Sequence, residues 1–280
     1  MTDSPLPPLI TAEELVAQLA GGSPPIVLDV RWTLAGTDEP GYLTGHLPGA
    51  RFLDLDRDLA GPPGLGGRHP LPDPAALQVA LRRLGLSDGS SVIVYDGGPG
   101  LSAARAWWLL RWSGLVNVRV LDGGLPAWLA DAGRGIATGP AAAPVAGTVT
   151  VRSGALPVVD ADGAVDAAVA GRLVDVRAAA RYRGEIEPID PVAGHIPGAV
   201  NLPITELMRA DGTYRPVAEI AAVLADAGVV AGRPVVASCG SGVTACQLVL
   251  AGELVGVQAI LYPGSYSQWC ALDRPVSTGA

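Results

Sequence analysis

The sequence is poor in several residue types, and each shortage excludes a class of protein. Its three cysteines show no paired spacing, which excludes a disulfide framework and fits a reducing compartment. Only 19 lysines and arginines stand against 27 acidic residues, and the net charge of −8 argues against a nucleic-acid partner. The three histidines are dispersed along the chain, so they do not predict a metal site.

Long hydrophobic runs are also missing. No apolar run reaches transmembrane length, and Met1 to Ile10 carry three prolines and no basic residue, which argues against a signal peptide. We therefore expect no membrane partner and a cytoplasmic location. What the chain does have is length and apolar content: 280 residues, 49% of them hydrophobic, are enough for two compact cores.

Four short segments occur twice in the same order. The second copies follow the first by 141 to 149 residues, which indicates that one unit was duplicated. The pairs are Leu28–Arg31 with Val174–Arg177, Gly45–Ala50 with Gly194–Ala199, Val92–Gly97 with Val235–Gly240, and Gly123–Trp128 with Gly264–Trp269. We expect two domains, at 1–138 and 148–280, joined by a linker at 139–147 within a stretch rich in glycine, proline and alanine.

Within each copy, short β-rich apolar runs alternate with stretches typical of helices. The expected strands are Ile26–Val30, Val92–Tyr95, Val118–Leu121, Leu173–Val176, Val235–Ser238 and Ala259–Leu261. The clearest expected helices are Ala75–Leu84, Arg105–Trp112, Val217–Ala227 and Ala245–Leu254. This alternation predicts an α/β fold in which each domain has a mostly parallel sheet flanked by helices.

Residues 235–246 hold the strongest candidate site. Cys239 follows a buried strand and opens a loop with two glycines, after which an apolar helix is expected. A cysteine at the carboxyl end of a strand and facing a helix N-terminus lies among backbone N–H donors, which favour the thiolate. A buried structural cysteine is the alternative, and the loop glycines favour a nucleophile. Cys246 and Cys270 are predicted to be packing residues.

Four motifs together resemble the rhodanese family, and more closely its two-domain sulfurtransferases. They are Asp-Val-Arg, Gly-His-Ile-Pro-Gly-Ala, Cys-x-x-Gly-Val-Thr and Tyr-x-Gly-Ser-x-x-x-Trp, and the resemblance runs from about Leu9 to Pro275. It implies that Cys239 takes sulfur from a small-molecule donor as a persulfide and passes it to a small thiol, a thioredoxin-like protein or cyanide, without a cofactor. The persulfide would lie within the backbone N–H groups of Gly240, Gly242, Val243 and Thr244.

The two copies differ at the cysteine position. The residue that matches Cys239 in the first copy is Asp96, followed by Gly97-Gly98-Pro99-Gly100. Because aspartate cannot carry sulfur, the first domain is expected to be catalytically silent. We expect one active site per chain, in the second domain.

Other chemistries fit the sequence less well. Phosphatases with a cysteine loop need an arginine six residues after the cysteine, and Ala245 stands there. A non-enzymatic rhodanese-like binding module typically loses the cysteine, whereas this loop keeps it. The glycine-rich segment Gly61–Gly67 lacks the Gly-Lys-[Ser/Thr] ending of a phosphate loop and is expected to be a surface loop.

The loop also bears on the sulfur donor. Thiosulfate-type rhodaneses, as the resemblance implies, carry cationic residues after the cysteine, whereas this chain has neutral Gly240 and Ser241. The loop is similar to that of 3-mercaptopyruvate sulfurtransferases, in which the serine works with a histidine and an aspartate. The matching residues are His69 and Asp56, which would form a proton relay with Ser241. Alternatively, His69 is an ordinary loop histidine.

The family's arginine pair, which holds the donor carboxylate, is incomplete. Arg181 matches the first arginine. The second normally follows Glu-Pro, but here Ile189 and Asp190 follow Glu187-Pro188, and Arg183 is the expected substitute. The departure leaves thiosulfate open as the alternative donor to 3-mercaptopyruvate.

Overall fold

The computed structural model describes residues 6–279. These residues form two compact units, the first made of 6–60, Pro72–Ala155 and Ala210–Tyr214, and the second of Gly61–Leu71, Leu156–Arg209 and 215–279. This division differs from the expected boundaries in four places, since residues 148–155 and Ala210–Tyr214, both expected in the second domain, belong to the first unit. The segment expected as a linker packs with the first unit, where Gly147 N–H donates to Arg82, and the loop Gly61–Leu71 belongs to the second unit.

The first unit contains a five-stranded sheet with the order β1-β7-β6-β2-β5, in which all neighbours are parallel. Its strands are β1 (Leu9–Ile10), β2 (Ile26–Asp29), β5 (Arg51–Phe52), β6 (Val92–Tyr95) and β7 (Val118–Leu121), with a separate hairpin of β3 (Trp32–Thr33) and β4 (Gly36–Thr37). Its helices are α1 (Ala12–Leu19), α2 (Glu39–Thr44), α3 (Leu55–Asp58), α4 (Pro74–Arg83), α5 (Leu101–Trp112) and α6 (Gly124–Leu129). Helix α5 packs on β6 and β7 and is almost wholly buried, which explains its apolar sequence.

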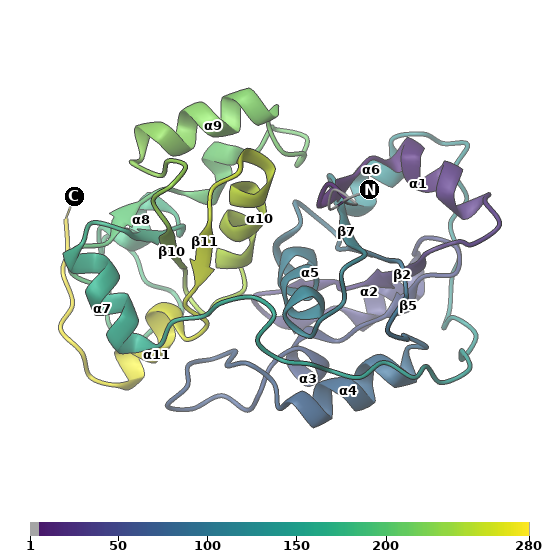
Figure 1. Cartoon of the computed structure of the whole chain (residues 1–280), viewed down its shortest axis with the longest axis horizontal. Coiled ribbons are helices and arrows are strands. Elements are labelled where there is room, and N and C mark those ends of the chain that lie inside the picture. The colour runs from purple at the N-terminus through teal and green to yellow at the C-terminus, as the bar shows by residue number, and fades with distance from the viewer. Residues whose placement is uncertain (1–5, 280) are drawn as a thin grey trace. The chain divides into compact units, whose positions relative to one another are not determined.

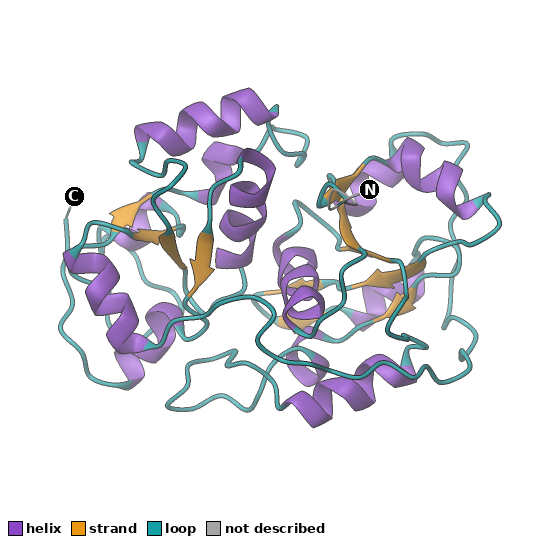
Figure 2. Cartoon of the chain, viewed as in Figure 1, coloured by secondary structure: helices purple, strands orange, loops and turns teal. Residues whose placement is uncertain are grey.

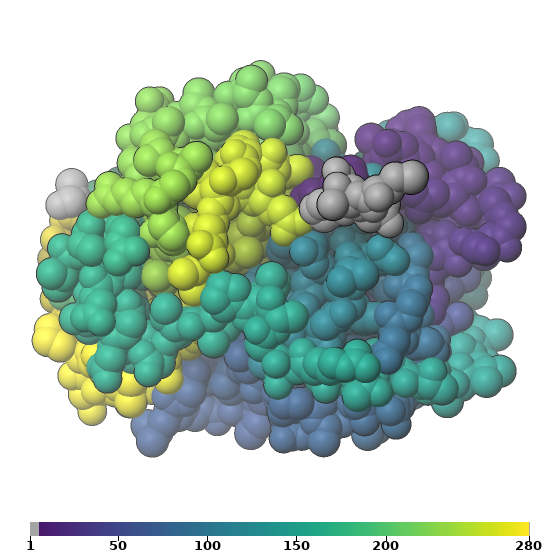
Figure 3. Space-filling view, viewed as in Figure 1, coloured from purple at the N-terminus to yellow at the C-terminus, as the bar shows by residue number. Residues whose placement is uncertain are grey.

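The second unit repeats this plan with a parallel sheet of order β11-β10-β8-β9. Its strands are β8 (Leu173–Asp175), β9 (Val200–Asn201), β10 (Val235–Ser238) and β11 (Ala259–Leu261). Its helices are α7 (Ala161–Val169), α8 (Ala179–Tyr182), η1 (Ile204–Leu207), α9 (Val217–Asp226), α10 (Ala245–Val255) and α11 (Ser265–Ala271). Helices α9 and α10 cover one face of this sheet and α7 and α11 the other (Figures 1 and 2). In the space-filling view, α9 forms part of the unit's surface (Figure 3).

The expected α/β fold with parallel sheets is confirmed. Each expected strand is present, although β2 and β8 end one residue earlier than the apolar runs indicated. Helix α5 begins four residues earlier than expected, at Leu101. Among the described residues, no helix combines the length and the apolar character needed to cross a membrane.

The repeated motifs have repeated structural roles. In each unit the arginine of Asp-Val-Arg forms a buried ion pair with the aspartate of the same motif, at 2.7 Å in both Arg31–Asp29 and Arg177–Asp175. The histidine of each Gly-His-x-Pro-Gly-Ala turn stacks on a tyrosine, with ring centroids 4.2 Å apart for His46 and 3.7 Å for His195. These histidines therefore brace their turns.

Candidate active site

Cys239 lies directly after β10, in the loop that leads to α10. Its side chain is buried, and the backbone N–H of Gly242 donates to Sγ over 3.2 Å. A backbone donor aimed at the sulfur stabilises negative charge there, on the thiolate or on the outer sulfur of a persulfide. The loop thus has the geometry expected for a nucleophilic cysteine.

The tight turn depends on Gly242. Its φ of +76° lies in the left-handed region, and a Cβ at this position would collide with the carbonyl group of Pro263. Only glycine fits both the backbone angle and the close approach. The glycine at this position of the loop is therefore required to point the N–H at the sulfur.

Helix α11 holds the cysteine loop from the other side. The backbone N–H groups of Tyr266 and Ser267 donate to the carbonyl oxygens of Cys239 and Gly240, at 3.0 and 2.8 Å. Ser265 Oγ accepts from Cys239 N–H at 3.1 Å and lies 4.0 Å from Sγ. Ser265 has a φ of +50°, a conformation that costs a non-glycine residue about 1–3 kcal/mol. The second copy of the Gly-x-x-x-x-Trp motif thus holds the backbone of Cys239 and Gly240 in place.

The structure brings Ser241 and His69 together within the second unit. Ser241 Oγ and His69 Nδ1 are 2.7 Å apart, although the residues are 172 positions apart in sequence. Ser241 is buried and His69 half-buried. Ser241 follows Cys239 by two residues, so the pair joins His69 to the cysteine loop.

Asp56, the third residue expected in the relay, lies in α3 of the first unit. Its carboxylate accepts from Trp32 Nε1 at 2.9 Å and from Thr37 N–H at 3.2 Å, both on the hairpin of that unit. These bonds fix the carboxylate, while its action on His69 stays a prediction.

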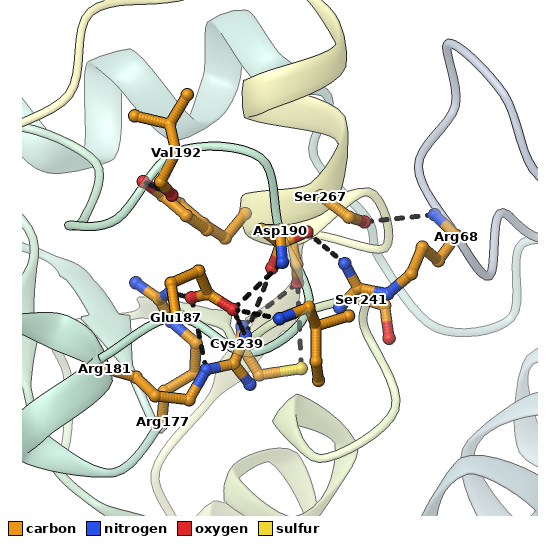
Figure 4. A network of polar contacts seen from close by, with 12 residues as sticks. Arg68, Arg177, Arg181, Glu187, Asp190, Val192, Cys239, Ser241 and Ser267 are labelled. Carbon is orange, nitrogen blue, oxygen red and sulfur yellow. Dashed lines mark hydrogen bonds and ion pairs between the residues drawn. The ribbon is translucent and has the colours of Figure 1, made fainter. Parts of the chain in front are cut away.

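A buried network of arginines and carboxylates lies beside the cysteine loop (Figure 4). Its acids are Glu187 and Asp190, whose side chains are 3% and 2% exposed. Glu187 pairs with Arg181 at 2.5 Å and with Arg177 at 3.4 Å. Asp190 pairs with Arg181 at 3.2 Å and, on its other oxygen, with Arg68.

The pKa values of the two acids in this network shift in opposite directions. Burial raises the pKa of Asp190 above its ordinary value, and the neighbouring arginines only partly offset this. Burial acts on Glu187 in the same direction, but hydrogen bonds from Arg181 and from the backbone N–H groups of Asp190 and Ile189 outweigh it and lower the pKa of Glu187. The network therefore stabilises the ionised form of Glu187.

Arg183, the expected substitute for the second arginine, is not part of this network. Its guanidinium pairs with exposed Glu185 at 2.6 Å, and the residue lines a separate hollow with Tyr182 and His195. The residue that joins Arg181 beside the loop is Arg68, which sequence reasoning missed. A partial signal was present: Ile189 stands where the resemblance places the second arginine, so a second cation beside Arg181 could come only from another part of the chain.

The other cysteines occupy packing positions. Cys246 is fully buried on α10, and its Sγ–H donates to the carbonyl of Gly242 over 3.3 Å. Burial raises the pKa of Cys270, which disfavours its thiolate. Both observations agree with the structural roles expected for them.

In the first unit, a carboxylate replaces the sulfur. Asp96 is buried after β6, and its carboxylate accepts bonds of 3.0 to 3.1 Å from the backbone N–H groups of Gly98, Gly100, Ser102 and Ala103. The Ser102 hydroxyl adds a further bond of 3.0 Å. The loop donors that would hold a sulfur anion thus hold the protein's own side chain.

Parallel sheets flanked by helices, with a cysteine at the carboxyl end of a central strand, define a class of α/β proteins in which a backbone loop stabilises a sulfur anion. Comparison with known proteins places the chain within this class. The family model of the rhodanese-like domain matches residues 11–131 and 160–272, and the chain belongs to the rhodanese family.

Several relatives cover nearly the whole chain. A Mycobacterium tuberculosis protein with the provisional name thiosulfate sulfurtransferase SseB is 44% identical over 97% of both chains. A Pseudomonas aeruginosa protein with the provisional name 3-mercaptopyruvate sulfurtransferase is also 44% identical, over 97% of this chain and 98% of its own. The crystal structure of SseA from Escherichia coli, described as a 3-mercaptopyruvate sulfotransferase, matches with a TM-score of 0.80 and 33% identity, over 93% of this chain and 99% of that chain.

Proposed function

We propose that this protein is a sulfurtransferase that moves sulfur from 3-mercaptopyruvate through a Cys239 persulfide to a thiol acceptor. The choice of donor rests on the 2.7 Å contact between Ser241 and His69. Ser241 stands two residues after Cys239, in a cysteine loop that has no cationic side chain of its own. A donor whose leaving group must be protonated makes use of such a pair, whereas sulfite needs no proton.

The proposed reaction has two steps. The Cys239 thiolate attacks the donor sulfur, the carbon–sulfur bond breaks, and its electron pair forms the enolate of pyruvate. Ser241 gives the enolate a proton and recovers one from His69, pyruvate leaves, and the persulfide accepts the N–H of Gly242. An acceptor thiolate then attacks the outer sulfur and restores the Cys239 thiolate. Cyanide in the same role yields thiocyanate.

The remaining parts of the proposal concern the first unit, the acceptor and the location. The first unit carries no sulfur, since the Asp96 carboxylate takes the place of the thiolate. The acceptor is a small thiol or a thioredoxin-like protein, and the protein acts in the cytoplasm, which agrees with three free cysteines. Thiosulfate is the second candidate donor, favoured by the name of the Mycobacterium tuberculosis relative.

Steady-state transfer to cyanide, measured with 3-mercaptopyruvate and thiosulfate in parallel, tests the donor. We expect kcat/KM to favour 3-mercaptopyruvate, and a preference for thiosulfate would reverse the assignment. Cys239→Ser should abolish transfer from either donor. Cys246→Ser is the matched control, because its hydroxyl can keep the bond to the Gly242 carbonyl and should leave transfer intact. Equal losses in the two variants would contradict a Cys239 persulfide.

A further inference from the structure

The loop 61–71 places a second guanidinium group, that of Arg68, beside the cysteine loop. We infer that Arg68, together with Arg181, binds the carboxylate of the sulfur donor, and that Arg68 takes over from the arginine missing beside Asp190. The inference rests on the proposed function and assigns its substrate class: a monoanionic carboxylate, as in a 2-oxo acid thiol.

The position of Arg68 is fixed by its backbone and its side chain. Its backbone N–H donates to Ser267 Oγ at 3.1 Å, and its guanidinium pairs with Asp190 (Figure 4). The loop turns sharply just before it, where Gly64 and Gly67 exchange backbone hydrogen bonds of 3.0 and 2.9 Å. Arg68 is thus held against the second unit at both ends, so little side-chain entropy remains to be lost on binding.

Arg68 and Arg181 converge on the residue that follows the nucleophile. A Cβ at Gly240 would lie 3.0 Å from Nη2 of Arg68 and 3.6 Å from Nη1 of Arg181. Thiosulfate-type loops carry a side chain at this position, and here the two guanidinium groups occupy that space. Two planar forks beside the nucleophile suit a carboxylate attached to the carbon next to the reacting centre.

The side chains of Arg68 and Arg181 are more exposed than that of Arg177. The Arg68 and Arg181 side chains are 29% and 15% exposed, whereas that of Arg177 is 2% exposed and stacks on Tyr266 at 4.0 Å. A ligand can therefore reach Arg68 and Arg181 but not Arg177. The buried acids Glu187 and Asp190 form ion pairs with these two partly exposed guanidinium groups and so fix their positions.

The charge balance of the network favours a monoanion. When Asp175, the ion-pair partner of Arg177, is counted with Glu187 and Asp190, the three arginines of the network face three carboxylates. A network without surplus positive charge attracts a dianion less strongly than a loop with added cations does. This agrees with a carboxylate donor in preference to thiosulfate.

Kinetics of Arg68→Gln test the inference. Loss of a charge-assisted hydrogen bond should raise the KM for 3-mercaptopyruvate on the order of 10- to 100-fold, with a much smaller change in kcat. Arg274→Gln is the matched control: Arg274 is 27% exposed and pairs with a carboxylate, but lies outside the network. An unchanged KM in Arg68→Gln, or an equal rise in the control, would overturn the inference.

A double variant separates binding from the neutralisation of a buried acid. If Arg68 served only to neutralise Asp190, the variant Arg68→Gln with Asp190→Asn would recover the wild-type KM, and the inference would fail. We expect the KM to stay high, because the cation itself is missing. Arg68→Lys, which keeps the charge without the fork, should recover part of the loss.

A chemical readout is independent of the proposed sulfur transfer. Iodoacetate carries a carboxylate and iodoacetamide does not, while both alkylate a thiolate with loss of iodide. The rate ratio of iodoacetate to iodoacetamide at Cys239, followed by peptide mass spectrometry, should fall on the order of tenfold in Arg68→Gln and stay constant in Arg274→Gln. A constant ratio in Arg68→Gln refutes the inference. If wild-type protein fails to use 3-mercaptopyruvate but the ratio falls, the proposed function is wrong and the anion site stands.

Discussion

The contact between Ser241 and His69 predicts that removing either residue affects the two donors differently. With 3-mercaptopyruvate the leaving group is an enolate, a strong base that needs a proton as it forms. General acid catalysis of such a step contributes roughly 10²- to 10⁴-fold. We expect Ser241→Ala and His69→Ala each to lower kcat with 3-mercaptopyruvate about 100-fold or more. With thiosulfate the leaving group is sulfite, so kcat should change only slightly.

The loss should be catalytic and not a loss of folding. One hydrogen bond of 2.7 Å between neutral, partly buried groups stabilises the native state by about 0.5–1.5 kcal/mol. For a domain of this size that corresponds to a Tm decrease of about 6 °C at most. Calorimetry on each variant should therefore show a nearly unchanged transition beside a large loss of turnover.

A double-mutant cycle completes the test. Because Ser241 and His69 are expected to act as one relay, removing both should cost little more than removing one. The reasoning is refuted if kcat falls equally with the two donors, or if the two single losses multiply in the double variant. Either result would rule out a shared proton relay to the enolate as the role of this pair, whereas an unchanged kcat in His69→Ala would make His69 an ordinary loop histidine.

Three further predictions concern backbone geometry, pH and the first unit. Gly242→Ala should abolish transfer and lower the Tm strongly, since its Cβ meets Pro263, whereas Gly228→Ala, at a similar φ of +75° with nothing within 4 Å, should cost about 1 kcal/mol in denaturant titration. Because the pKa of Glu187 is lowered from its ordinary value of 4.5, its ionised form stabilises the fold fully above pH 4.5, and this stabilisation is lost as pH falls through the lowered pKa. The Tm difference between wild type and Glu187→Gln should therefore shrink in acid. A constant difference would contradict the assignment. Asp96→Ala leaves several buried N–H groups unpaired and should lower the free energy of unfolding by about 2–4 kcal/mol, while the Cys239 persulfide still forms on addition of donor, as mass spectrometry can show.

The sequence predicted the parts of the molecule that local patterns determine. The strands β6 and β10 are short, fully buried runs that begin with β-branched residues, and each lies inside a parallel sheet. The cysteine loop could be located because strand, glycine turn and apolar helix follow one another without interruption. The contact of Ser241 with His69 was expected only through the resemblance, since no local pattern links residues so far apart.

The sequence could not predict which unit the loop 61–71 joins. Glycines and prolines dominate this loop, so it has no hydrophobic periodicity to indicate a packing partner. Its attachment depends on single polar contacts, such as Arg68 N–H to Ser267 and its guanidinium to Asp190, across 199 and 122 residues of chain. Arg183 was the expected cation because it is close in sequence, and the structure pairs it with Glu185 instead.

The comparison of Asp96 with Cys239 explains how one loop can be structural in one unit and reactive in the other. In the first unit the carboxylate is fixed by N–H donors of the following helix, so its loop is a satisfied cap that needs no ligand. In the second unit the Cys239 sulfur accepts a hydrogen bond from Gly242 N–H. A thiol can take up one more sulfur atom as a persulfide, which the backbone N–H of the same loop can stabilise. A carboxylate cannot accept a sulfur atom, whereas a thiolate can bind one as a persulfide and release it again. The duplicated loop therefore supports the fold in the first unit, and in the second it has the means to carry sulfur.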